Sequence, residues 1–274
     1  MRETFDPSWL ALREGIDHRS RSPIGLRSLR EWWFTRRASR VLDLGCGTGS
    51  NLRYLAPRLP GPQRWTLLDR DAELLRRVRG PDQEVGDLTL EVVEGDLATE
   101  GLALVAEVDL VTASALLDLV SEAWLDALID ACTEAGTAAH FALSYDGTIS
   151  WGGTDDPLDS VVRNAVNQHQ LGDKGLGPAL GPNAGLGAWD RFKARGFLTD
   201  IVPSPWVVGP NDAELAIALI DGWATAAAEQ LPGQTDEVRR WAERRRASVT
   251  TDDFLLMVGH VDVFALPYWL EPER

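Results

Sequence analysis

The residues whose types and spacing point most directly to chemistry form one segment, Asp43-Leu44-Gly45-Cys46-Gly47-Thr48-Gly49. Glycines at alternate positions let a backbone bend tightly and approach a ligand without side-chain interference. The spacing is G-x-G-x-G, whereas the dinucleotide-binding fingerprint is G-x-G-x-x-G. The acid Asp43 precedes the first glycine by two positions. A carboxylate there favours a cofactor that carries an α-amino group and no pyrophosphate.

The elements that must position this segment follow an alternating pattern of strands and helices. An apolar strand over residues 40–44 leads into the glycines, and a helix over residues 49–59 follows them. A helix that begins at a glycine loop turns its free backbone N–H groups toward a bound ligand. Such alternation indicates βαβ units and a parallel sheet. Further strands are expected over residues 65–68, 90–93, 108–113 and 138–144, and further helices over residues 72–78 and 121–135.

The alternation of strands and helices does not continue in the residues that precede and follow this core in the sequence. Residues 1–39 are predicted to form a helical arm, and residues 40–274 one decorated domain. In the second half, Asp156 is expected to cap a helix that Pro157 opens. The remaining elements are expected as helices over residues 9–14 and 26–37 with breaks at Gly15 and Ser22-Pro23, a helix ending near residue 170, a loop over residues 172–187, strands over residues 197–208 and 255–266, and two helices within residues 212–246.

Residues 41–49, Val-Leu-Asp-Leu-Gly-Cys-Gly-Thr-Gly, closely resemble the first motif of class I S-adenosylmethionine-dependent methyltransferases. The later motifs of that family also have counterparts, strongly over residues 40–144. The resemblance implies a Rossmann-like α/β fold with a seven-stranded, mostly parallel sheet, an antiparallel last strand and helices on both faces. The sequence further predicts an N-terminal helical arm and, where the family usually has a short hairpin, a helical insertion before the last strand.

The resemblance also implies which residues hold S-adenosylmethionine and, after transfer, S-adenosylhomocysteine. Asp69 corresponds to the acid that accepts hydrogen bonds from both ribose hydroxyls, and Asp96 with Leu97 to the segment that contacts the adenine. An arginine of the arm, where Arg13, Asp17 and Arg21 recur at four-residue spacing, could pair with the cofactor's carboxylate. The resulting set of cofactor-binding candidates is Asp43, Gly45, Cys46, Gly47, Asn51, Asp69, Arg70, Asp96, Leu97, Ser114 and Arg21.

Residues for the methyl acceptor are harder to identify, because methyl transfer needs a general base only where the nucleophile must lose a proton. His169 is either a core residue or a base that faces the acceptor. Asp118 follows the fourth strand and Tyr145 the fifth, at the sheet edge where α/β proteins bind ligands. The segments 151–187 and 212–246 are longer than connections require, and we expect them to close over the acceptor.

Two features of the sequence depart from the family or limit the function. No Asn-Pro-Pro-Tyr-like motif follows the fourth strand, which argues against methylation of adenine or glutamine amino groups. The net charge of −15 disfavours a nucleic-acid substrate, although residues 1–40 contain nine arginines and five acids. The composition thus favours a cytoplasmic enzyme with a small-molecule acceptor, and neither a membrane segment nor a metal-ligand pattern is expected.

Three functions remain open on the sequence alone. The first is methylation of a small molecule at oxygen, nitrogen or carbon. The second is a protein that binds S-adenosylmethionine without transferring its methyl group. The third is a dinucleotide-dependent oxidoreductase, which the glycine spacing and Asp96 oppose.

Overall fold

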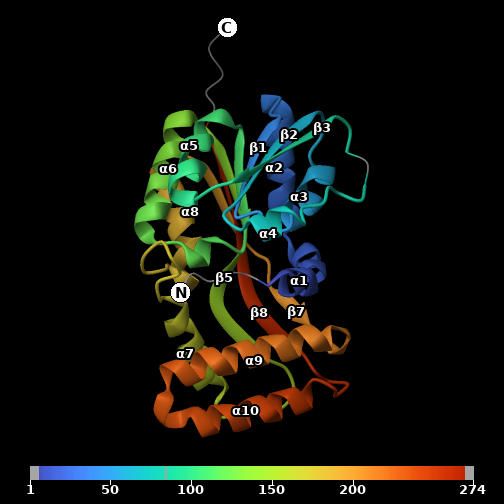
Figure 1. The fold of residues 1–274 in the computed structure, drawn as a ribbon, viewed down its shortest axis with the longest axis vertical. Helices are drawn as coiled ribbons and strands as arrows, with labels where there is room; N and C mark the ends of the chain where they lie inside the picture. Colours follow the sequence, from blue (N-terminus) through green and yellow to red (C-terminus); the bar gives the residue numbers. More distant parts are fainter. Residues whose placement is uncertain (1–5, 84, 269–274) are drawn as a thin grey trace.

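An eight-stranded sheet forms the centre of the fold, which a computed structural model describes for residues 6–83 and 85–268 (Figure 1). The strand order is β3-β2-β1-β4-β5-β8-β6, and β7 pairs with β8 outside this path. Strands β1 to β5 run parallel, and β8 runs antiparallel to β5, β6 and β7. The expected Rossmann-like sheet with an antiparallel last strand is confirmed. The strands are β1 (Arg40–Leu44), β2 (Gln63–Asp69), β3 (Leu88–Glu94), β4 (Leu110–Ser114), β5 (Ala138–Trp151), β6 (Leu198–Pro203), β7 (Trp206–Val208) and β8 (Leu256–Leu266).

Helices cover both faces of this sheet (Figure 1). One core packs α2 and α3 against β1 and β2, and a second packs α6 and α8 against β4 and β5. Within the described residues, no helix combines the length and apolar character needed to cross a bilayer. The α-helices are α1 (Pro7–Ser20), α2 (Pro23–Arg36), α3 (Ser50–Leu55), α4 (Ala72–Leu75), α5 (Leu102–Leu104), α6 (Glu122–Ala135), α7 (Asp159–Gln170), α8 (Ala184–Ala194), α9 (Ala213–Gln230) and α10 (Thr235–Ser248).

Two strands differ from the sequence prediction. The stretch predicted as one strand over residues 197–208 is two strands, because it breaks at Ser204-Pro205 and proline cannot donate to a sheet. Strand β5 continues to Trp151, well beyond residue 144, because its antiparallel pairing with β8 extends to the register pair of Trp151 and Leu256. This extension carries β5 and β8 past the parallel part of the sheet.

Glycine misled the prediction at two helices. Helix α1 runs through Gly15 to Ser20, since one glycine costs a helix only about 1 kcal/mol and this helix buries Ile16 against the core. Helix α8 occupies part of the stretch that was predicted as a loop. A Cβ on Gly185 would lie 2.4 Å from Cγ2 of Val261, so this glycine permits close contact between helix and sheet.

Helix α7 begins later than predicted. Its first residue is Asp159, and Leu158 rather than Asp156 occupies the N-cap position. The Asp156 carboxylate instead accepts a hydrogen bond from the Leu158 N–H (3.0 Å), which makes a turn ahead of the helix. Residue type predicted the helix, but not that Leu158 would occupy its N-cap position.

The helices α7, α9 and α10 pack around the extended ends of β5 and β8, at the lower end of Figure 1. Their interior is aromatic: Trp151 contacts Trp223, Trp241 and Phe254 in edge-to-face geometry. The buried guanidinium of Arg245 lies 4.4 Å from the Trp151 ring and pairs with Asp159. The insertion between β7 and β8 is thus a packed part of the domain.

Candidate cofactor site

The glycine segment forms a tight loop between β1 and α3. Gly45 and Gly47 have φ angles of +63° and +55°, a left-handed conformation that favours glycine. The Cys46 N–H donates to the Leu68 carbonyl (3.0 Å), and the Gly47 N–H donates to Oδ2 of Asp69 (2.8 Å). These bonds fix the loop against the end of β2.

A pocket of about 520 Å³ opens over this loop, at the carboxyl ends of the parallel strands. That volume lies in the range of sites for small ligands and cofactors. Every cofactor-binding candidate from the sequence except Arg21 lines it. The lining therefore includes Asp43, Gly45, Cys46, Gly47, Asn51, Asp69, Arg70, Asp96, Leu97 and Ser114.

Asp43 stands out among the acids of the pocket, because it is fully buried and only one of its two carboxylate oxygens has a hydrogen-bond partner among the described residues. Its Oδ1 accepts a hydrogen bond from Asn51 (2.8 Å), while its Oδ2 has no hydrogen-bond partner among the described residues. Burial raises the pKa of this carboxyl to about 7. A buried carboxylate oxygen without a partner fits the protonated amino group of a ligand.

Other residues of the loop are suited to contact rather than proton transfer. Burial, together with the charges of Asp43 and Asp69, raises the pKa of the Cys46 thiol, so the thiol stays protonated. Asp69 ends β2, and its Oδ1 accepts the Asp71 N–H (3.0 Å) while Oδ2 holds Gly47. The two oxygens of Asp69 are thus fixed at the pocket wall.

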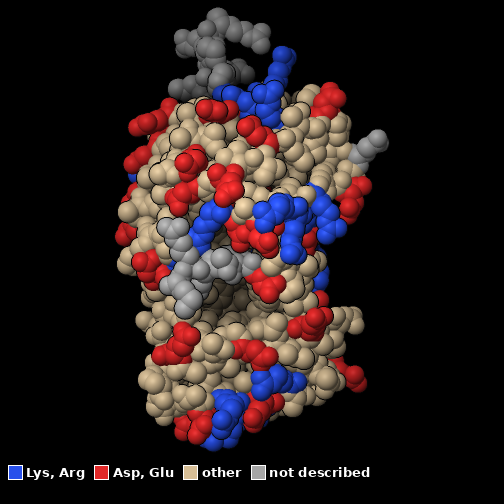
Figure 2. Space-filling model, viewed as in Figure 1, with Lys and Arg blue, Asp and Glu red and all other residues tan. Residues whose placement is uncertain are grey.

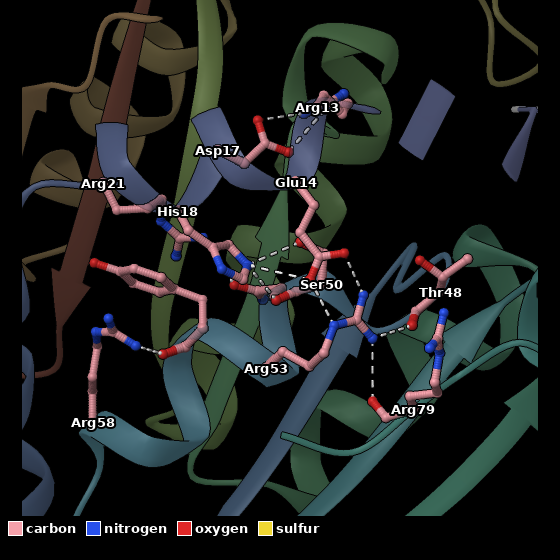
Figure 3. Close-up of polar contacts among 12 residues, drawn as sticks. Arg13, Glu14, Asp17, His18, Arg21, Thr48, Ser50, Arg53, Arg58 and Arg79 are labelled. Carbon is pink, nitrogen blue, oxygen red and sulfur yellow. Dashed lines mark hydrogen bonds and ion pairs between the residues drawn. The ribbon is translucent and has the colours of Figure 1, made fainter. Parts of the chain in front are cut away.

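Helix α1 closes one side of the pocket and is held there by polar contacts (Figure 3). Arg53 of α3 binds Glu14 through two hydrogen bonds (2.6 and 2.7 Å) and also donates to the Thr48 carbonyl (2.6 Å). Nε2 of His18 lies 3.1 Å from both oxygens of Ser50. The arm is therefore joined directly to the glycine loop and the start of α3.

The arm residue that reaches the pocket is not the one that the sequence analysis selected. Arg13 and Asp17 line the pocket and pair with each other (2.9 Å), and Leu10 lies opposite Gly47. Arg21 is buried behind the loop, where it donates to Oδ1 of Asn51 (3.1 Å). The assignment of Arg21 as a direct ligand is corrected: the four-residue spacing identified the right helix face, but Arg21 lies past the end of α1.

None of the three catalytic candidates lines the pocket. Asp118 lies in the chain between the pocket-lining residues Leu116 and Leu119, and burial raises its pKa to about 6. Tyr145 is buried and donates to Asn167 (2.8 Å), and burial also raises its pKa. His169 lies elsewhere, on α7 beside α9, where it contacts Glu229 (3.1 Å). The structure therefore places His169 outside the site.

The loop after α7 supplies two further pocket residues, Lys174 and Leu176, which are not among the cofactor-binding or catalytic candidates from the sequence. Among the described residues, no residue of the segment 212–246 lines the pocket. The first of the two expected covering segments therefore reaches the pocket and the second does not. Apolar residues such as Leu176 carry no chemical signal in a sequence, since only the fold shows that they face a cavity.

Replacing His169 by alanine should leave cofactor affinity unchanged within about twofold, because a half-exposed pair with Glu229 contributes about 0–1 kcal/mol to stability and nothing to the pocket. Calorimetric titration with S-adenosylhomocysteine measures this directly. A tenfold loss of affinity in a variant that melts like the wild type would contradict the placement.

Comparisons with known proteins place the glycine loop in a recognised domain. Residues 41–136 match a family model described as a methyltransferase domain. A search of curated proteins found no match. The described residues also contain no cluster of three or more histidine, cysteine or acidic side chains that could hold a metal ion.

Several solved structures are similar to the chain at low sequence identity. A S-adenosylmethionine-dependent methyltransferase from Geobacter sulfurreducens, solved with S-adenosyl-L-homocysteine, is 17% identical, covering 96% of this chain and 99% of the other, with a TM-score of 0.43. A cyclopropane-fatty-acyl-phospholipid synthase-like protein from Lactobacillus casei is 16% identical, covering 97% and 96%, with a TM-score of 0.48. Residues 41–136 thus match a methyltransferase domain, and this match includes the glycine loop that forms the floor of the pocket.

Proposed function

We propose that the chain transfers the methyl group of S-adenosylmethionine to a small-molecule acceptor. The observation that carries this proposal is the unpartnered Oδ2 of Asp43 on a pocket walled by the glycine loop. A dinucleotide phosphate would be repelled by that carboxylate, whereas an α-ammonium group would bind it. The neighbouring residues fit the rest of the cofactor.

Each part of the pocket has a proposed role. Asp43 binds the cofactor's ammonium group, Asp69 its ribose hydroxyls, and Asp96 with Leu97 its adenine. Arg13 takes the role proposed for an arm arginine, because it lines the same pocket and carries the positive charge that a carboxylate binds. When bound, the cofactor supplies a methyl group on a sulfonium sulfur, an electrophile that any aligned nucleophile can attack.

The acceptor is proposed to enter at the end of the pocket walled by Ala115, Leu119, Val120 and Leu176. These side chains are apolar and exclude water, which favours displacement at a charged sulfonium. Figure 2 shows a hollow in this face of the molecule, between the regions of α1 and α9. We further propose that the loop carrying Lys174 and Leu176 covers the acceptor.

Proton removal, where the acceptor needs it, is proposed for Asp118, which does not itself line the pocket but lies in the chain between the lining residues Leu116 and Leu119. Its Oδ1 has no hydrogen-bond partner among the described residues, and the charges of Arg13 and Lys174 lower its pKa while burial raises it to about 6. A carboxylate of that pKa is ionised at neutral pH and is a stronger base than an ordinary aspartate.

A methyl-release assay tests the proposal. Wild-type protein with S-adenosylmethionine labelled in the methyl group is incubated with a panel of small molecules bearing hydroxyl, amino and activated carbon groups. Label should move to at least one acceptor class with wild type and to none with Gly47→Val. Binding of the cofactor without transfer to any acceptor would favour a non-methylating cofactor-binding protein.

Duplex DNA and transfer RNA are not expected to bind at physiological salt, because the chain carries a net charge of −15. Acidic and basic side chains are interspersed on the face shown in Figure 2, without a continuous basic surface. Filter binding with labelled duplex and transfer RNA measures this. Salt-sensitive binding below about 1 µM would contradict it and direct attention to the arginine-rich residues 1–40.

A further inference from the structure

Arg21 is a buried cation behind the pocket rather than a residue of its wall. It lies directly after α1, with only 5% of its surface exposed. Its Nη1 donates to Oδ1 of Asn51 (3.1 Å), and its guanidinium lies 4.6 Å from the Tyr54 ring. Its Nε forms a buried ion pair with Oδ2 of Asp262 (3.8 Å), which is longer than a hydrogen bond. Asn51, which lines the pocket, is therefore the residue through which Arg21 can act on the site.

The contact with Arg21 determines which way the Asn51 amide points. A guanidinium can only donate hydrogen bonds, so Asn51 must present its carbonyl oxygen to Arg21 and its NH₂ group to the opposite side. On that side, Nδ2 donates to Oδ1 of Asp43 (2.8 Å) and to Oγ1 of Thr112 (3.1 Å). With the amide reversed, two donors would meet at Arg21 and two acceptors would meet at Asp43.

We propose that Arg21 is a positioning residue that acts through Asn51: it favours the ionised form of Asp43 and leaves Oδ2 free for the ammonium group of the cofactor. The chain Arg21–Asn51–Asp43 links the arm to the pocket without any contact between Arg21 and the ligand. This inference rests on the proposed cofactor but assigns a role to a residue outside its binding site.

The charges around Asp43 agree with this role. Burial raises the pKa of Asp43 to about 7, the hydrogen bond from Asn51 and the charge of Arg21 lower it, and the charge of Asp69 raises it. Two other titratable groups, the Cys46 thiol beside Asp43 and His140 beside Arg21, stay neutral because burial raises the pKa of the first and lowers that of the second. Arg21 is thus the cation that offsets Asp69.

The sign of the pH dependence follows from these shifts. The cofactor's ammonium group requires ionised Asp43, so affinity should fall as pH drops below the pKa of Asp43. Loss of Arg21 raises that pKa further, so a variant without this cation should lose affinity at neutral pH and recover it in mild alkali. A purely structural defect would weaken binding equally at every pH.

Arg58 provides a matched control. Its guanidinium lies 4.0 Å from the same Tyr54 ring and donates to the Tyr54 carbonyl, but Asn51 is not among its hydrogen-bond partners. Arg21→Met and Arg58→Met therefore each remove a cation from Tyr54, and only the first interrupts the path to Asp43. Asn51→Leu interrupts the same path while Arg21 stays in place.

The experiment compares the affinity for S-adenosylhomocysteine of each variant with that of the wild type, by calorimetry between about pH 6 and pH 9. The ratio at each pH cancels titration of the ligand. For Arg21→Met the loss should be about tenfold near pH 6 and close to onefold near pH 9, as a pKa rise of about one predicts. Asn51→Leu should behave similarly, and Arg58→Met should give a ratio near one throughout.

A loss that is the same at every pH, or an equal effect of Arg58→Met, would overturn the inference. Carbon-13 NMR titration of the Asp43 carboxyl in cofactor-free protein is the second readout, and a pKa left unchanged by Arg21→Met would also overturn it. Should Arg21→Met fail to fold, Asn51→Leu and Arg21→Lys take its place. Absence of S-adenosylhomocysteine binding in wild type would instead count against the proposed cofactor, while the NMR titration would still test the link.

Discussion

Replacing Gly47 by valine is expected to abolish measurable binding of S-adenosylmethionine and S-adenosylhomocysteine, a loss of at least about a hundredfold. Gly47 has a φ of +55°, and a Cβ there would lie on the pocket side of the loop, 3.3 Å from Cδ1 of Leu10. A branched side chain fills the space between the arm and the loop, and it also strains the backbone that presents the Gly47 N–H to Asp69. Calorimetric titration measures the loss.

Backbone strain from the valine has to be separated from blockage of the pocket, and Gly136 provides the control. It ends α6 with a φ of +66°, and an added Cβ there meets no atom within 4 Å. Gly136→Val should lower the melting temperature much as Gly47→Val does but keep wild-type affinity. If both variants bound the cofactor normally, the glycine loop would not be the site.

Asp69→Ala should weaken cofactor binding by about a hundredfold or more. The proposed ribose contacts are two hydrogen bonds to a charged group, each contributing about 1.5–3 kcal/mol, and 1.4 kcal/mol corresponds to a factor of ten. The same substitution also frees the Gly47 N–H that Oδ2 holds at 2.8 Å. Calorimetry with S-adenosylhomocysteine again supplies the measurement, and Asp69→Asn should lose less because an acceptor oxygen remains.

Asp109 is the matched control for this substitution. Its carboxylate also accepts two backbone N–H groups, from Ser39 (2.9 Å) and Arg40 (3.0 Å), but at the opposite end of the parallel strands. Asp109→Ala should therefore destabilise the fold and leave affinity intact. Equal affinities for Asp69→Ala and wild type would remove Asp69 from the site.

The parallel core and its loop could be predicted from the sequence because their signals are local. The apolar strand 40–44, the glycines and the acid that ends β2 each lie within a few residues of the position they define. Side chains at the carboxyl ends of parallel strands must meet at one edge of the sheet. For this reason ten of the eleven cofactor candidates reach one pocket although they span residues 43–114.

The remaining features depend on contacts between distant segments, which no local pattern reports. Gly185 looks like a loop residue, yet it lies in α8, at a point where Val261 leaves no room for a Cβ. The spacing of the arm arginines does not reveal that α1 ends at Ser20, which puts Arg13 on the pocket and Arg21 behind it. His169 has the right apolar face on α7, but that face packs toward α9 instead of the pocket.

Direct binding of the two rival cofactors decides the assignment on which these expectations depend. Purified wild-type protein is titrated in a calorimeter with S-adenosylhomocysteine and, separately, with NAD. We expect saturable binding of S-adenosylhomocysteine, one molecule per chain, that Gly47→Val eliminates, and no binding of NAD. Binding of NAD in preference to S-adenosylhomocysteine, or binding of S-adenosylhomocysteine that Gly47→Val leaves unchanged, would contradict the placement of the cofactor over Asp43 and Asp69.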